Sequence, residues 1–95
     1  MYAVIKNIIH KGLRRFFTQD DKSLLNAKDY SRISRILDRL DAAADVMDMN
    51  LPGYNLHKLT GNMKGFWSVK VSSNWRITFR FEEDDAHDVN LEDYH

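Results

Sequence analysis

Cysteine is absent from this chain of 95 residues, and proline occurs once, at Pro52. Without cysteine there is neither a disulfide framework nor a zinc site built on thiolates. The longest run without Asp, Glu, Lys or Arg covers nine residues, 49–57, whereas a transmembrane helix needs ~20. The first residues lack the basic lead-in and cleavage site of a signal peptide. We therefore expect a soluble, cytoplasmic protein.

Other absences narrow the class of protein further. The chain has no glycine-rich phosphate loop and no serine-hydrolase elbow, so those two routes to catalysis are excluded. It has no repeats, low-complexity tracts or linkers. A hydrophobic fraction of 43% is too high for a disordered chain, and the length suits one core. We predict a single domain over residues 1–95.

The formal net charge of zero conceals a block pattern. Residues 1–40 hold nine Lys and Arg against four acids, and residues 54–80 hold five bases and no acid. Residues 41–53 hold three acids, and residues 81–95 hold seven, without a base in either block. A basic block interleaved with aromatic residues favours a local anion site over general polyanion binding, although solvated surface charge explains the pattern equally well.

Hydrophobic spacing predicts one strand and two helices in the first half. Residues 1–6, MYAVIK, alternate and favour a strand. In residues 10–21 the apolar positions recur at i, i+3 and i+4, which is typical of a helix. A second helix has a stripe of apolar residues that we expect to face the core: Ile33, Ile36, Leu37 and Leu40.

The last third of the chain predicts antiparallel strands. Residues 66–71 and 75–81 each carry one apolar face and are joined through SSN, as in a hairpin. The acidic EEDD is a turn, and residues 86–95 form a further strand. The order β-α-α-β-β-β predicts an α+β fold, with two N-terminal helices packed on one face of a small, mainly antiparallel sheet.

Strand parity suggests where chemistry lies. The apolar residues of the middle strand are odd-numbered, so Arg76, Thr78 and Arg80 should project from the face opposite the helices. Val89 and Leu91 should point to the core. Tyr94 should then share the uncovered face with Arg76, whereas Trp67 and Trp75 belong to the core by the same parity.

Several polar residues form a plausible set for RNA cleavage without a metal. That reaction needs a base for the ribose 2′-OH, an acid for the leaving 5′-oxygen, and positive charge beside the phosphate. Histidine suits either proton role, Arg76 can bind a phosphate bidentately, and Tyr94 can stack on a base. The candidates are His57, Lys58, Asn74, Arg76, Asp93, Tyr94 and His95.

Two alternatives stand beside this interpretation. A lone histidine is more often a surface or hydrogen-bonded residue than a catalyst, which is our interpretation of His10 and His87. A metal site is the other alternative, but the potential oxygen and nitrogen ligands lack a recognised spacing. Those residues are Asp85, His87, Asp93 and His95. We predict neither a metal nor a cofactor.

Four motifs in order resemble the HigB-type toxins of bacterial toxin–antitoxin systems, within the RelE superfamily. Residues 56–61 are similar to the family's L-H-x-L-x-G turn, and residues 65–71 to its aromatic strand. Residues 74–79, NWRITF, and the terminal DYH complete the pattern. The resemblance covers nearly the whole chain and is densest from Asn55 onward.

The resemblance implies a ribosome-dependent endoribonuclease that cuts mRNA in the ribosomal A site and leaves a 2′,3′-cyclic phosphate and a 5′-hydroxyl. It implies contact with 16S rRNA and mRNA. It also implies a HigA-type helix-turn-helix antitoxin, through which the protein would reach operator DNA, and no membrane partner.

Carried over by position, the resemblance assigns the active site to His57, Arg76, Asp93, Tyr94 and His95, with Asn74 contacting substrate. The proton roles of His57, Asp93 and His95 stay open.

The chain departs from the family at Thr60, where a lysine is common. Lys58 and Lys64 are the candidates to replace that charge, and we count Lys58, Thr60, Lys64 and Asn74 as substrate-binding positions. The departure also supports an alternative, a catalytically weak toxin fold that acts mainly through antitoxin pairing and co-repression of the operon.

Overall fold

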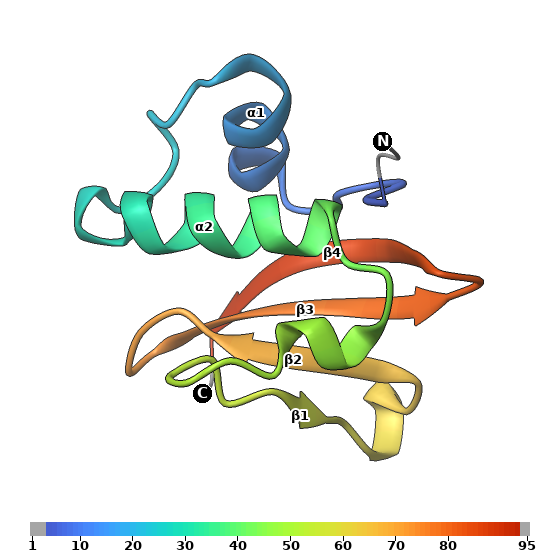
Figure 1. Ribbon diagram of the computed structural model, residues 1–95. Helices are drawn as coiled ribbons and strands as arrows, with labels where there is room; N and C mark the ends of the chain where they lie inside the picture. The colour runs from blue at the N-terminus through green and yellow to red at the C-terminus, as the bar shows by residue number, and fades with distance from the viewer. Residues whose placement is uncertain (1–3, 94–95) are drawn as a thin grey trace.

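A computed structural model describes residues 4–93. Two α-helices come first, followed by the strands of one sheet (Figure 1). The helices and strands are α1 (Lys11–Gln19), α2 (Tyr30–Asp41), β1 (His57–Lys58), β2 (Phe66–Lys70), β3 (Trp75–Glu82) and β4 (Asp85–Asp93). Short 3-10 helices connect them: η1 (Ala27–Asp29), η2 (Val46–Met49) and η3 (Gly61–Met63).

The predicted α+β architecture is confirmed. The strands are ordered β1-β2-β3-β4, and each neighbouring pair is antiparallel. Figure 1 shows α1 and α2 together on one side of the sheet. The apolar stripe of α2 is buried, and it packs into one core with the odd-numbered residues of β2 and β3. The opposite face, called here the open face, carries the even-numbered residues of those strands.

The N-terminal segment differs from the regular strand that its alternation predicted. In its described part it pairs with β4 through two isolated parallel bridges, Ile5 with Ala86 and Ile8 with Val89. Between the two bridged residues of β4 lies Asp88, whose φ of 53° is left-handed. This bulge interrupts the ladder, so a continuous parallel pairing cannot form.

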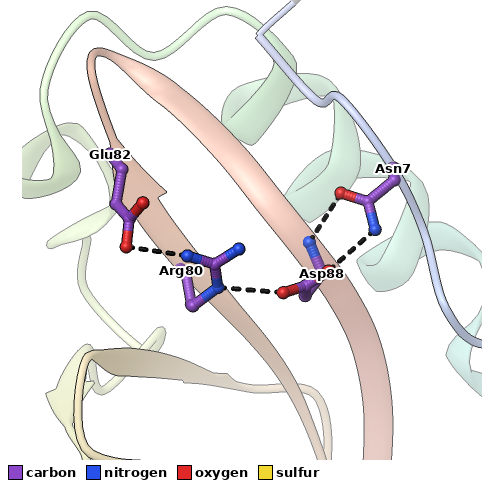
Figure 2. Close-up of polar contacts among 4 residues, drawn as sticks. All are labelled: Asn7, Arg80, Glu82 and Asp88. Carbon is purple, nitrogen blue, oxygen red and sulfur yellow. Dashed lines mark hydrogen bonds and ion pairs between the residues drawn. The ribbon is translucent and has the colours of Figure 1, made fainter.

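A polar network fixes the bulge (Figure 2). Asn7 and Asp88 bond reciprocally: Asn7 Nδ2 donates to Asp88 Oδ1 at 2.8 Å, and the Asp88 backbone N–H donates to Asn7 Oδ1 at 2.9 Å. Arg80 Nε donates to Asp88 Oδ2 at 2.9 Å and Nη1 to Glu82 Oε1 at 2.7 Å. Together, the hydrogen bonds from Asn7 and Arg80 lower the pKa of Asp88 below its ordinary value.

The turns follow the predicted punctuation. β2 and β3 are joined across residues 71–74, and β3 meets β4 at Glu83 and Asp84. Both of these residues have positive φ, 53° and 66°, which gives the tight two-residue geometry that suits the twist of a hairpin. Within residues 4–93, no helix is long and apolar enough to cross a membrane.

Candidate functional site

The bulge at Asp88 decides which residues meet on the open face. From the turn to the bulge, β3 and β4 pair in one register, with Arg80 opposite His87. Beyond it the register has moved by one residue, and Arg76 lies opposite Glu92. Without that shift Arg76 would face Leu91, because a slip of one residue exchanges the two faces of a strand. The bulge therefore creates a polar site where an unbroken ladder would place a leucine.

Two cross-strand rows make up the centre of the open face. The Arg76 row consists of Lys70, Arg76 and Glu92, which are Cα partners across β2, β3 and β4. The His57 row consists of His57, Ser68, Thr78 and Asn90, one from each strand. Cross-strand partners share a face, and the two rows are two residues apart, or about 7 Å along a strand. The pairing thus brings the predicted His57 and Arg76 to adjacent rows.

Arg76 is held within its row by Glu92. Its Nη2 lies 3.6 Å from Glu92 Oε1, and the side chains are 22% and 27% exposed. The other oxygen of Glu92, Oε2, accepts a hydrogen bond from the Thr78 hydroxyl at 2.8 Å. Thr78 points away from the helices as predicted, but it is buried rather than open. Thr78 is buried because β3 lies between β2 and β4 and because the Glu92 side chain is hydrogen-bonded to the Thr78 hydroxyl.

His57 and Lys58 separate at the edge strand. His57 is exposed and pairs with Ser68, which is buried on the open face. Lys58 pairs with Trp67 and therefore lies on the other side of β1 from His57. Its Nζ is 5.7 Å from the centre of the Trp67 ring, within range of a cation–π contact. The structure does not bring Lys58 onto the face that carries Arg76.

Thr60 and Lys64 flank η3, in the connection between β1 and β2. β2 begins at Phe66, which is opposite Arg80, so this connection lies beyond the Arg80 end of the sheet. Arg76 is four residues from Arg80, or about 13 Å along the strand. Figure 1 shows η3, the yellow helical turn, at the other end of the sheet from the β2–β3 connection. Thr60 and Lys64 are thus not beside Arg76.

Asn74 and Asp93 lie at the Arg76 end of the sheet. Asp93 is exposed and is the Cα partner of Trp75, the residue after Asn74. By this register Asp93 lies on the helix side of β4, whereas its neighbour Glu92 lies on the open face. Tyr94 and His95 lie outside the described residues, so the predicted placement of Tyr94 on the face of Arg76 stays a prediction.

Two residues of the Arg76 row, Lys70 and Glu92, were not among the predicted site residues. The Lys70 side chain is exposed, while its backbone is fixed: its N–H donates to Tyr54 O at 2.7 Å, and its carbonyl accepts from Arg32 Nε at 3.1 Å and Nη2 at 2.9 Å. Arg32 Nη2 also donates to the carbonyl of Gly53. Lys70 and Glu92 have even numbers, as Arg76 does, and this shared strand parity could have placed them on the face of Arg76 from the sequence.

His10 has the structural role that the sequence suggested. It is the N-cap of α1, where its Nδ1 accepts a hydrogen bond from the Leu13 N–H at 3.1 Å. Burial lowers its pKa, which favours the neutral ring that this bond requires.

Among residues 4–93, neither a cluster of metal ligands nor the cavity beside α2 offers a second site for the predicted residues. Among residues 4–93 no group of three or more His, Asp or Glu side chains is placed to hold a metal ion, and His95 of the predicted ligand set lies outside that range. A cavity of about 850 Å³ lies between the end of α2 and the segment from η2 to Tyr54. It contains no predicted site residue.

Comparisons with known proteins agree on one family. Residues 6–95 match the model of the RelE-like toxin of the type II toxin–antitoxin system HigB. The chain is 42% identical over 92 residues to Endoribonuclease HigB of Proteus vulgaris, covering 97% of this chain and 100% of that protein. It is 30% identical over 84 residues to Toxin HigB-1 of Vibrio cholerae, covering 86% and 88%.

The fold is also similar to a solved structure. The solution structure of a conserved hypothetical protein from Helicobacter pylori matches with a TM-score of 0.54 at 15% identity, covering 99% of this chain and 96% of that one. At this identity the likeness concerns the fold alone.

Proposed function

The chain belongs to the HigB family of RelE-like toxins of type II toxin–antitoxin systems, and we propose that it is an endoribonuclease that cuts mRNA in the ribosomal A site. The name and the 42% identity of the Proteus vulgaris relative support ribonuclease activity. The observation that carries the proposal is the adjacency of the His57 row and the Arg76 row on the open face.

The proposed reaction needs no metal. A base removes the proton of the ribose 2′-OH, O2′ bonds to phosphorus, and the P–O5′ bond breaks as an acid protonates O5′. The products are a 2′,3′-cyclic phosphate and a 5′-hydroxyl. His57, Asp93 and His95 are the candidates for the proton transfers, and their roles stay open between base and acid.

Arg76 supplies the positive charge in this proposal. Its guanidinium can hold two phosphate oxygens in a fork and stabilise the negative charge that grows at the transition state. Lys70, its exposed neighbour in the same row, adds a second charge. We propose that Lys70 supplies the charge that the family commonly has at position 60, because Lys58 and Lys64 lie away from the Arg76 row. Tyr94 would orient or stack on a base, and Asn74 would contact substrate.

The family supports a proposal about the partners of this chain. A type II toxin has an antitoxin partner; we propose that it is a HigA-type helix-turn-helix protein that also links the toxin to operator DNA. We propose the ribosome, through 16S rRNA and A-site mRNA, as the second partner, and the cytoplasm as the compartment of the activity.

A second candidate is a catalytically weak toxin fold that acts through antitoxin pairing and co-repression. Thr60 at the usual lysine position favours it. Inducing the chain without its antitoxin distinguishes the two: growth arrest with new mRNA ends in A-site codons supports the nuclease, whereas normal growth with intact antitoxin binding supports the binding module.

A further inference from the structure

Glu92 contacts two residues of the open face at once. Its Oε2 accepts the Thr78 hydrogen bond at 2.8 Å, and its Oε1 lies 3.6 Å from Arg76 Nη2. Thr78 is fully buried at the centre of the sheet. A short, buried side chain therefore anchors the carboxylate, and the carboxylate lies against the guanidinium.

We propose that Glu92 is a positioning residue for Arg76 in the RNA-cleavage site, an assignment that rests on the proposed function. Glu92 does not bind the substrate, because a carboxylate repels RNA phosphate. It holds the Arg76 fork on the open face before RNA arrives. An arginine side chain has many rotamers, and a guanidinium that is already oriented loses less of this freedom in reaching the transition state.

This role predicts a separation between binding and chemistry. Loss of the Glu92 charge removes a repulsion towards RNA, so KM should not rise. Loss of the bridge leaves Arg76 less ordered when charge develops on the phosphate, so kcat should fall. A residue that only stabilised the fold would lower the amount of active protein without this pattern.

Glu92→Gln is the direct test. Glutamine keeps the shape but loses the negative charge, so any contact that it makes with the Arg76 guanidinium is weaker than the contact of a carboxylate. On ribosomes that carry a defined mRNA, we expect kcat about tenfold lower and KM unchanged or lower. Thr78→Val removes the hydrogen bond from the Thr78 hydroxyl to Glu92 and should lower kcat about threefold. Adding Thr78→Val to Glu92→Gln should lower kcat no further.

Asp21→Asn is the matched control, because it removes the charge of another carboxylate–arginine pair, 3.7 Å from Arg15 Nη1, that lies outside the sheet and outside the network at the bulge. It should leave kcat within about twofold of the wild type. Circular dichroism and thermal unfolding check that each variant folds.

The possible outcomes separate the two proposals. If the wild type cuts and Glu92→Gln keeps its kcat, or if the Thr78→Val and Glu92→Gln losses multiply, Glu92 does not position Arg76 and the proposed function stands. If Glu92→Gln fails to fold, Thr78→Val alone decides, and an unchanged kcat overturns the assignment. If the folded wild type cuts no mRNA, the proposed function itself fails.

Discussion

Arg76 on β3 lies directly opposite Glu92 on β4, with Nη2 3.6 Å from Oε1, on the face of the sheet that the helices leave uncovered. The relationship exists because a bulge at Asp88 moves the register of the two strands by one residue. Local backbone geometry thereby determines which side chain meets the proposed phosphate-binding arginine.

Replacement of Arg76 should remove most of the activity. Arg76→Ala deletes the proposed donor to the phosphate, and the loss of one such donor typically lowers kcat by about 10² to 10³. Single-turnover cleavage on programmed ribosomes measures the effect. Arg35→Ala, an exposed arginine of α2, is the control and should cut normally. A loss shared equally by both variants would point to general basicity instead of a phosphate site.

The three lysines should differ in their contributions. Lys70→Ala removes a charge from the Arg76 row, so we expect kcat/KM to fall about fivefold. Lys64→Ala and Lys58→Ala act outside that row and should each change kcat/KM less than twofold, by about 0.4 kcal/mol at most. The same cleavage assay ranks them. A larger loss at Lys58 than at Lys70 would restore Lys58 as the replacement for the family's lysine.

His10 should make stability depend on pH near neutrality. Its folded pKa is lowered by burial, so the unfolded chain takes up the proton first, near its ordinary pKa of about 6.5. The His10 contribution is present above that pH and is lost as the pH falls through the unfolded and then the folded pKa.

Urea unfolding at pH 7.5 and about pH 5 measures this loss, which should be about 1 kcal/mol or less, the usual size of an N-cap. His10→Asn keeps a capping oxygen without a titrating ring, so its stability should change less between the two pH values. An equal change in both proteins would assign the dependence to other groups.

Asp88 should contribute to acid sensitivity at lower pH. Its folded pKa lies below its ordinary value because of the hydrogen bonds from Asn7 and Arg80. The contribution is therefore present above the unfolded pKa, about 3.9, and is lost as the pH falls through that value to the folded pKa.

Asn7→Ala removes the first of these hydrogen bonds and should reduce the acid dependence between about pH 5 and pH 2, measured by thermal unfolding. Because the same bond fixes the bulge, Asn7→Ala should also weaken cleavage in proportion to any loss of the Arg76–Glu92 pairing. Unchanged unfolding curves at every pH would mean that Asn7 does not hold Asp88.

The sequence predicted the helices, the hairpin and the face of Arg76, because those depend on local periodicity. Alternation over Trp75 to Phe81 is enough to assign the faces of β3. It is not enough to pair Arg76 with Glu92, since that pairing depends on a bulge at an aspartate in left-handed conformation, a geometry that glycine more often marks. The neighbours of Arg76 across the sheet, Lys70 and Glu92, follow only from the pairing register of β2, β3 and β4.

The lysine that replaces the charge missing at Thr60 also could not be predicted from spacing along the chain. On an extended segment Lys58 would share a side with Thr60, and so it was a reasonable substitute by parity. The structure ends β1 at Lys58 and turns the chain through η3, which carries Lys64 to the far end of the sheet. Lys70 adjoins Arg76 through pairing between strands, which spacing along the chain does not reveal.

Mapping mRNA 5′ ends after induction of the chain without antitoxin shows whether the open face of the sheet cuts mRNA on the ribosome. Wild-type induction should produce new 5′-hydroxyl ends within A-site codons, and Arg76→Ala should produce almost none. Growth arrest without new ends would mean that the chain does not act by cutting mRNA, and equal cutting by Arg76→Ala would mean that Arg76 is not the phosphate-binding residue.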